Sequence, residues 1–158
     1  MLERLVDTAL EGRGAHVLTA NVFDGLDWRL AGDQPSGSPY TVWQLLSHMI
    51  YWQDFGLSLV HGIEPEKPPH ASDSWPGGAA PESEQAWLNA VARFKAGLAE
   101  SRREAQQDAG APTATHPDKT RAERLTATAS HNSYHAGQVT LLRRMLGSWP
   151  PPGGGDTW

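Results

Sequence analysis

Cysteine is absent from the 158-residue chain. This absence excludes disulfide bonds, a cysteine nucleophile and thiolate metal ligands, so any metal must be bound through nitrogen or oxygen atoms. Long apolar runs are absent too, since no stretch reaches the roughly 18 residues that suggest a membrane-spanning helix. The segment from Met1 to Asp7 is interrupted by charged side chains, unlike a secretory signal peptide. We therefore expect a cytoplasmic protein without a membrane partner.

The chain also has few basic residues, with 13 Lys and Arg against 18 Asp and Glu, and a formal net charge of −5. Proteins that bind a phosphate backbone usually carry a basic patch, whereas these basic residues are scattered, so nucleic-acid binding is disfavoured. The hydrophobic content of 39% and the charged content of 20% are typical of a folded globular protein. We expect residues 1–158 to form a single domain.

Apolar residues recur at helical spacing in four segments, which glycine- and proline-rich stretches separate. The expected helices cover residues 2–23, 41–60, 81–107 and 120–147. Gly12 weakens the first of them. Thr41 with Gln44, and Thr120 with Glu123, have the spacing of capping boxes and predict the starts of the second and fourth helices. No segment predicts a strand.

The segment 63–81 is rich in proline, glycine and serine and has no periodicity. A connection of roughly 20 residues is unusual in a compact domain and indicates a functional loop or a crossover. Four-helix bundles accommodate one such crossover directly. We therefore predict an all-α four-helix bundle with a long crossover between its second and third helices. We expect this crossover to form a wall of any pocket and to set its specificity.

Two histidines, His131 and His135, are four residues apart in the fourth expected helix. Residues at this spacing share one face of a helix, so both imidazoles can reach one metal ion. Imidazole is the commonest protein ligand for zinc, nickel and similar metals. The same spacing is also common on solvated helix faces, so the pair alone indicates a metal site only weakly.

A third histidine strengthens the hypothesis. His48 lies between Leu45 and Trp52 on the apolar stripe of the second expected helix. Three inward-facing histidines need polar partners, and one ion would satisfy all three. Three protein ligands with open positions are typical of catalytic metal sites, whereas structural zinc sites fill four. The alternative is a metal-free bundle in which hydrogen bonds satisfy each histidine separately.

Other side chains could contribute to such a site. Gln138, one turn from His135, and Gln44, one turn before His48, could accept the second N–H of each imidazole and orient it. Both could equally be ordinary solvated glutamines. Tyr134 could bond a substrate or face another helix, and two tryptophans could line the pocket or belong to the core: Trp52 and Trp158.

The segments Thr41–His48, His131–Gln138 and Leu142–Arg144 resemble the DinB/YfiT-like superfamily, and the resemblance extends over nearly the whole chain. It implies a four-helix bundle of up-down-down-up topology with the long connection between helices two and three. It also implies a metal ion, zinc or nickel, bound by one histidine of the second helix and two of the fourth. Nothing in the chain resembles a DNA polymerase.

By this resemblance His48, His131 and His135 are the metal ligands, and His16 is a residue that could line the pocket mouth, although a packing role is the simpler reading. Characterised relatives include thiol S-transferases that use bacillithiol or other low-molecular-weight thiols, and a mycothiol-dependent isomerase. We expect a metal-dependent enzyme with a small-molecule substrate, either such a transferase or a hydrolase. A non-catalytic metal- or ligand-binding module that forms a homodimer is the alternative.

Overall fold

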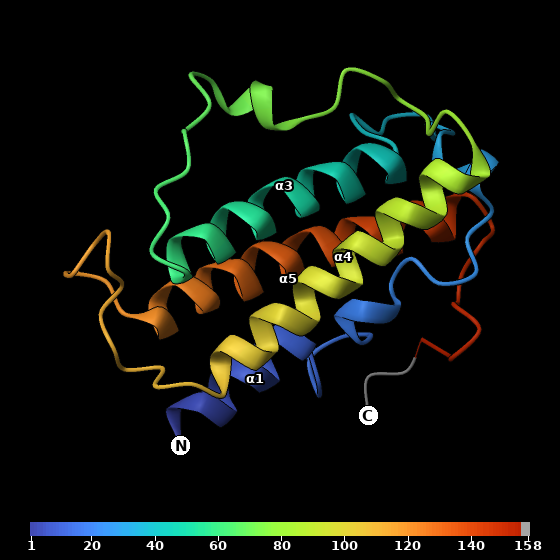
Figure 1. Ribbon diagram of the computed structural model, residues 1–158. Helices are drawn as coiled ribbons and strands as arrows, with labels where there is room; N and C mark the ends of the chain where they lie inside the picture. The colour runs from blue at the N-terminus through green and yellow to red at the C-terminus, as the bar shows by residue number, and fades with distance from the viewer. Residues whose placement is uncertain (156–158) are drawn as a thin grey trace.

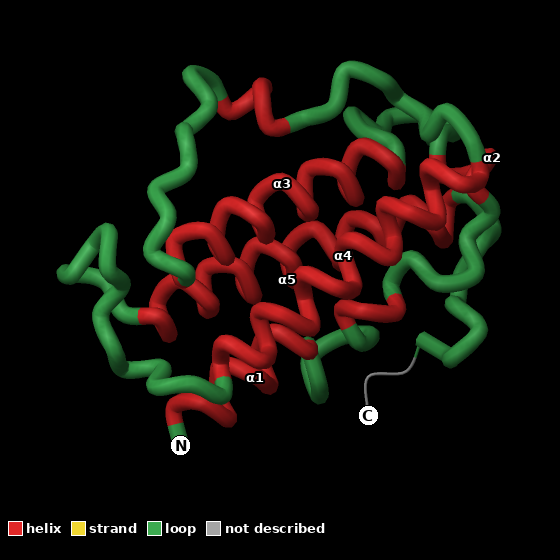
Figure 2. Tube along the Cα trace, in the orientation of Figure 1, coloured by secondary structure: helices red, strands yellow, loops and turns green. Residues whose placement is uncertain are grey.

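The computed structural model describes residues 1–155, and this part of the chain is helical, with one isolated β-bridge between Pro112 and Thr120 (Figure 2). The predicted all-α class is confirmed. The elements in chain order are α1 (Leu2–Glu11), η1 (Thr19–Asn21), α2 (Trp28–Ala31), α3 (Val42–Val60), η2 (Ala71–Ser74), α4 (Glu84–Ala105) and α5 (Arg121–Met145).

Both predicted capping boxes are present and fix the starts of the helices that carry the histidines. Thr41 Oγ1 accepts the Gln44 N–H of α3, and Gln44 Oε1 accepts the Thr41 N–H. Thr120 and Glu123 make the same pair of bonds at the start of α5. Each box satisfies backbone donors that the first helical turn leaves unpaired.

The first helix is shorter than predicted. The expected helix over residues 2–23 was wrong, because α1 ends at Glu11 and η1 is a separate element. Gly12 adopts φ 78°, and its N–H donates to the Thr8 carbonyl. Glycine enters this left-handed conformation at little cost, so it ends the helix and turns the chain back toward the bundle.

Four helices form the bundle: α3 packs against α4 and α5, and α1 packs against the same two helices (Figure 1). The connection over residues 61–83 runs along the outside of α3 before α4 begins. The up-down-down-up order of helix directions stays a prediction. None of the described helices is both long enough and apolar enough to span a lipid bilayer.

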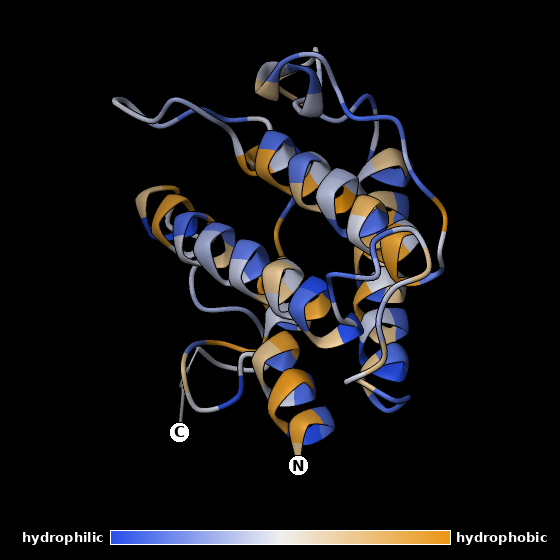
Figure 3. Cartoon of the chain, turned by 90° about the vertical axis from the view of Figure 1, so that its left-hand side faces the viewer, coloured by the Kyte–Doolittle hydropathy of each residue, from blue (hydrophilic) through white to orange (hydrophobic). Residues whose placement is uncertain are grey.

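The long helices carry hydrophobic and hydrophilic residues on different sides (Figure 3), and the apolar sides form two buried clusters. Along α5 the smaller cluster extends to Ala129 and the larger one begins at Ala136. Buried polar residues occupy the layer between them: His48, Gln53, Asn132 and His135. Polar groups are costly to bury without partners, so the partners of this layer identify its role.

Candidate metal centre

The structure brings the three predicted histidines together in this polar layer. One nitrogen from each of His48, His131 and His135 lies within 4.8 Å of the others. His48 Nε2 and His131 Nε2 are 3.2 Å apart, and the ring centroids of His131 and His135 are 4.4 Å apart. The i, i+4 spacing places two rings on one face of α5, and the packing of α3 against α5 supplies the third.

Hydrogen bonds to uncharged groups fix the tautomer of two of these rings. His48 Nδ1 lies 3.3 Å from the Ser74 carbonyl oxygen and 3.1 Å from Ser74 Oγ. His135 Nδ1 lies 2.7 Å from Gln138 Oε1. A carbonyl oxygen only accepts hydrogen bonds, so both Nδ1 atoms carry the proton. Nε2 of each ring is therefore the unprotonated nitrogen, the form in which imidazole binds metals.

Burial keeps the centre uncharged. His48 and His135 are buried, and His131 is partly buried. Burial and, to a smaller extent, the charge of a protonated His135 lower the pKa of His48 to about 4. Burial, followed by the charges of both neighbouring histidines, lowers the pKa of His131 to about 4, and burial also lowers the pKa of His135. All three rings are therefore neutral at pH 7, and His48 and His135 present the lone pair of Nε2.

An aromatic stack covers one side of the centre, and the ring that lies against His48 comes from the long connection. The Trp75 ring lies parallel to His48 at 3.9 Å between centroids, and Tyr40 stacks on Trp75 at 3.9 Å. Trp52 presents its ring to His48 and His131, each at 6.4 Å. The crossover thus contacts the centre through Ser74 and Trp75, while its role as the wall of a substrate pocket stays a prediction.

The remaining predicted residues lie in different places. Gln138 contacts His135 as expected. Gln44 was expected to accept the second N–H of His48, but its side-chain oxygen caps α3. Ser74 accepts from His48 Nδ1 instead. Tyr134 is 67% exposed, and the centroid of its ring lies 5.0 Å from that of the His135 ring. Trp158 lies outside the described residues.

His16 lies away from the histidine centre. It contacts Ser133 of α5 and lines a cavity between α1 and α5 whose lining includes none of the three histidines, so its contacts fit the simpler packing role.

Four residues that the sequence did not single out support the centre. Trp75 and Ser74 belong to the aperiodic crossover. The sequence offered one signal for a contact of this segment with the bundle, namely that Trp75 is a large aromatic residue in a polar loop. Asn132 Nδ2 donates to Gln53 Oε1 at 3.2 Å, and Gln53 Nε2 donates to the Phe94 carbonyl. These two hydrogen bonds link α5 to α3 and α3 to α4 next to His131, and they restrain the three helices from sliding along one another.

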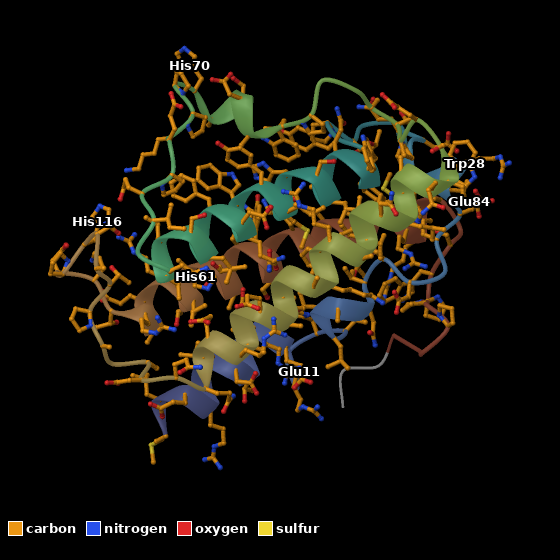
Figure 4. All side chains as sticks on the ribbon, in the orientation of Figure 1. Glu11, Trp28, His61, His70, Glu84 and His116 are labelled. Carbon is orange, nitrogen blue, oxygen red and sulfur yellow. The ribbon has the colours of Figure 1, made fainter. Side chains whose placement is uncertain are left out.

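A second group with metal-compatible donors lies at the end of α3, where Figure 4 labels His61. His61 Nε2 is 3.6 Å from Glu100 Oε1 and 3.6 Å from Glu104 Oε1. The other oxygens of these carboxylates are bonded by Arg103 and Arg121. His70 and His116 lie on peripheral loops, as Figure 4 shows, and belong to neither group.

The comparison with protein families agrees with the geometry. The family model of the DinB superfamily matches residues 13–139, which is more than half of the chain and includes all three histidines of the centre. The chain belongs to the DinB superfamily. No curated protein and no solved structure matches it. Membership in the DinB superfamily thus supports the fold and the metal hypothesis.

Proposed function

We propose that this DinB-superfamily protein binds one divalent metal ion through His48, His131 and His135 and is a metal-dependent enzyme. The observation that carries the proposal is the convergence of one nitrogen from each of these three histidines, all within 4.8 Å of one another, in a mostly buried centre. His48 Nε2 carries a lone pair, because its Nδ1 donates to Ser74. His135 Nε2 also carries a lone pair, because its Nδ1 donates to Gln138 Oε1. A cation shared by converging lone pairs satisfies them together.

The residues present fit such an ion. Imidazole nitrogens suit zinc and nickel, and three protein ligands leave at least one position for a reactant. A divalent ion in such a site lowers the pKa of a bound thiol or water and supplies a nucleophile near neutral pH. Ser74 and Gln138 hold the imidazole tautomers, and the rings of Trp75 and Trp52 limit access of bulk water.

We further propose a thiol-dependent S-transfer reaction, in which a low-molecular-weight thiol attacks a small electrophilic substrate. A mainly apolar cavity of about 300 Å³ next to the centre supports a small-molecule substrate. Two of its lining residues connect it to the centre: Gln138 bonds His135, and Tyr40 stacks on Trp75, which stacks on His48. Metal-dependent hydrolysis is the second enzymatic candidate, since the same site would activate water. A cytoplasmic location is part of the proposal.

A non-catalytic module that forms a homodimer is the alternative, and one surface favours it. Tyr134, Leu141 and Met145 are all more than half exposed and lie at positions i, i+7 and i+11 of α5. These positions form one stripe on the helix, which a second copy could cover.

The proposal is tested by elemental analysis of protein purified without a metal-affinity tag, followed by assays. About one equivalent of metal, lost in His48→Ala, supports the site; less than a tenth of an equivalent in the unchanged protein overturns it. Thiol consumption with a generic electrophile is then measured with and without chelator. A chelator-sensitive rate with thiol supports S-transfer, chelator-sensitive ester hydrolysis without thiol supports the hydrolase, and a rate that chelation leaves unchanged rejects both.

A further inference from the structure

His16 and Ser133 make a close contact on the side of α5 that faces α1. His16 Nε2 lies 2.7 Å from Ser133 Oγ, and His16 Nδ1 lies 2.7 Å from the carbonyl oxygen of Val17. Because the carbonyl only accepts, Nδ1 carries the proton and Nε2 presents its lone pair to Ser133. The Ser133 hydroxyl therefore donates to His16, which is how a serine nucleophile is paired with its general base.

The local backbone is shaped to hold this imidazole. Gly12 has φ 78°, and a Cβ built on it would lie 2.3 Å from His16 Cε1. Any side chain at position 12 would therefore collide with the ring as well as strain the backbone. The Val17 carbonyl fixes both the tautomer and the orientation of the ring, the part that an acidic side chain plays in a complete triad.

A cavity of about 340 Å³ gives access to both groups. Its other lining residues are mostly small or apolar: Leu5, Thr8, Ala9, Gly12, Arg13, Ala15, Ala129 and Ser130. Arg13 is the one charged residue among them, and its guanidinium is bonded to Glu11. The lining therefore suits a small uncharged acyl group better than an anion.

This pair is separate from the histidine centre although both use α5. Ser133 is two residues from His131 and from His135, which is a rotation of roughly 200° about the helix axis. Ser133 contacts the turn after α1, whereas His131 contacts α3. One helix thus presents different chemistry on two of its faces.

We propose that Ser133 is the nucleophile, and His16 the general base, of a second, metal-independent site that accepts a small uncharged carboxylic ester. The Ser133 hydroxyl gives its proton to His16 Nε2 as Oγ bonds to the ester carbonyl carbon. The C–O bond of the ester then breaks, and the leaving alcohol takes the proton from Nε2. Water attacks the acyl-serine with His16 again as base, and Ser133 recovers its proton as the carboxylic acid leaves.

The test is covalent labelling of the full chain with a small alkyl fluorophosphonate, located by peptide mass spectrometry. We expect one adduct, on Ser133, and no adduct in Ser133→Ala. The labelling rate should fall at least about 100-fold in His16→Gln, because general-base catalysis contributes roughly 10²–10⁴ in rate. Hydrolysis of 4-nitrophenyl acetate should fall in the same two variants.

Ser58→Ala is the matched control, because Ser58 is also a helical serine, but its hydroxyl donates to the Asp54 carbonyl and it does not line this cavity. This variant should be labelled at the unchanged rate, and removing metal with a chelator should leave Ser133 labelling unchanged. Thermal unfolding of each variant establishes that it is folded. Failure of Ser133 to be labelled in the unchanged protein overturns the proposal outright. Equal labelling of Ser130 and Ser133, or the unchanged rate in folded His16→Gln, also overturns it.

Discussion

Within residues 1–155, two groups of side chains have donor atoms close enough to share a metal ion, and they differ in almost everything else. The centre of His48, His131 and His135 is mostly buried, and uncharged groups accept hydrogen bonds from the Nδ1 atoms of His48 and His135. In the second group His61 is exposed, and arginines already bond both of its carboxylates.

The difference teaches that the spacing of donors does not by itself make a site. Removing the arginines from the carboxylates of the second group would cost interactions that already exist, and water screens what a cation would gain there. The three imidazoles of the buried centre have neutral lone pairs in a poorly solvated place, where an unmet polar group is costly. We therefore expect metal at the buried centre and none at the exposed group.

The largest expected effect is that of removing one ligand. Structural zinc sites are worth about 10–16 kcal/mol, or roughly 3 kcal/mol per ligand, so His48→Ala should weaken zinc binding by about 100-fold or more. Competition with a chromophoric chelator measures the affinity. Zinc affinity unchanged by His48→Ala would contradict the account of the buried centre.

A smaller effect is expected from the group that orients a ligand. Gln138→Leu removes the acceptor of His135 Nδ1 and should weaken zinc binding by about 10–100-fold. Gln44→Leu is the matched control, since its oxygen caps α3; it should lower the free energy of unfolding by about 1 kcal/mol and leave zinc affinity unchanged. If the two variants weaken zinc binding equally, the orienting role of Gln138 is wrong.

The stability of the metal-free protein should depend on pH through the buried histidines. Their pKa values are lowered in the folded state, to about 4 for His48 and His131, from 6.5. Between pH 6.5 and 4 the unfolded chain thus binds more protons, so stability falls as the pH is lowered through this window and levels off below it. Thermal unfolding in chelator should show a shallower fall for His131→Gln than for the unchanged protein; equal slopes would contradict the lowered pKa.

The smallest effect is expected at the exposed group. His61→Ala should change zinc affinity and stoichiometry by less than about twofold, because exposed ion pairs contribute little and their carboxylates already have partners. Isothermal titration of this variant beside the unchanged protein measures both quantities. A lost equivalent of zinc would show that the exposed group is a site after all.

The sequence predicted those parts of the fold and the site that local rules determine. The capping boxes at Thr41 and Thr120 depend on residues three positions apart, and the facing of His131 and His135 depends on helix geometry. His48 could be added because its helix has a clear apolar stripe. These features needed no knowledge of distant contacts.

The rest depended on tertiary contacts that no local pattern encodes. Ser74 and Trp75 lie in an aperiodic crossover, so only the folded chain shows that they cover His48. Gln44 was predicted to orient His48 because it lies one helical turn before it, but its side-chain oxygen accepts the Thr41 N–H in the cap of α3. The length of the first helix was overestimated because its apolar spacing continues past Gly12, where the backbone turns.

The central claim is tested most directly by anomalous diffraction from crystals of the protein loaded with one equivalent of zinc. The account predicts one strong peak about 2.0–2.1 Å from a nitrogen of each of His48, His131 and His135, the usual distance for zinc bound by imidazole. A peak only between His61, Glu100 and Glu104, or no peak at the buried histidines, would contradict it.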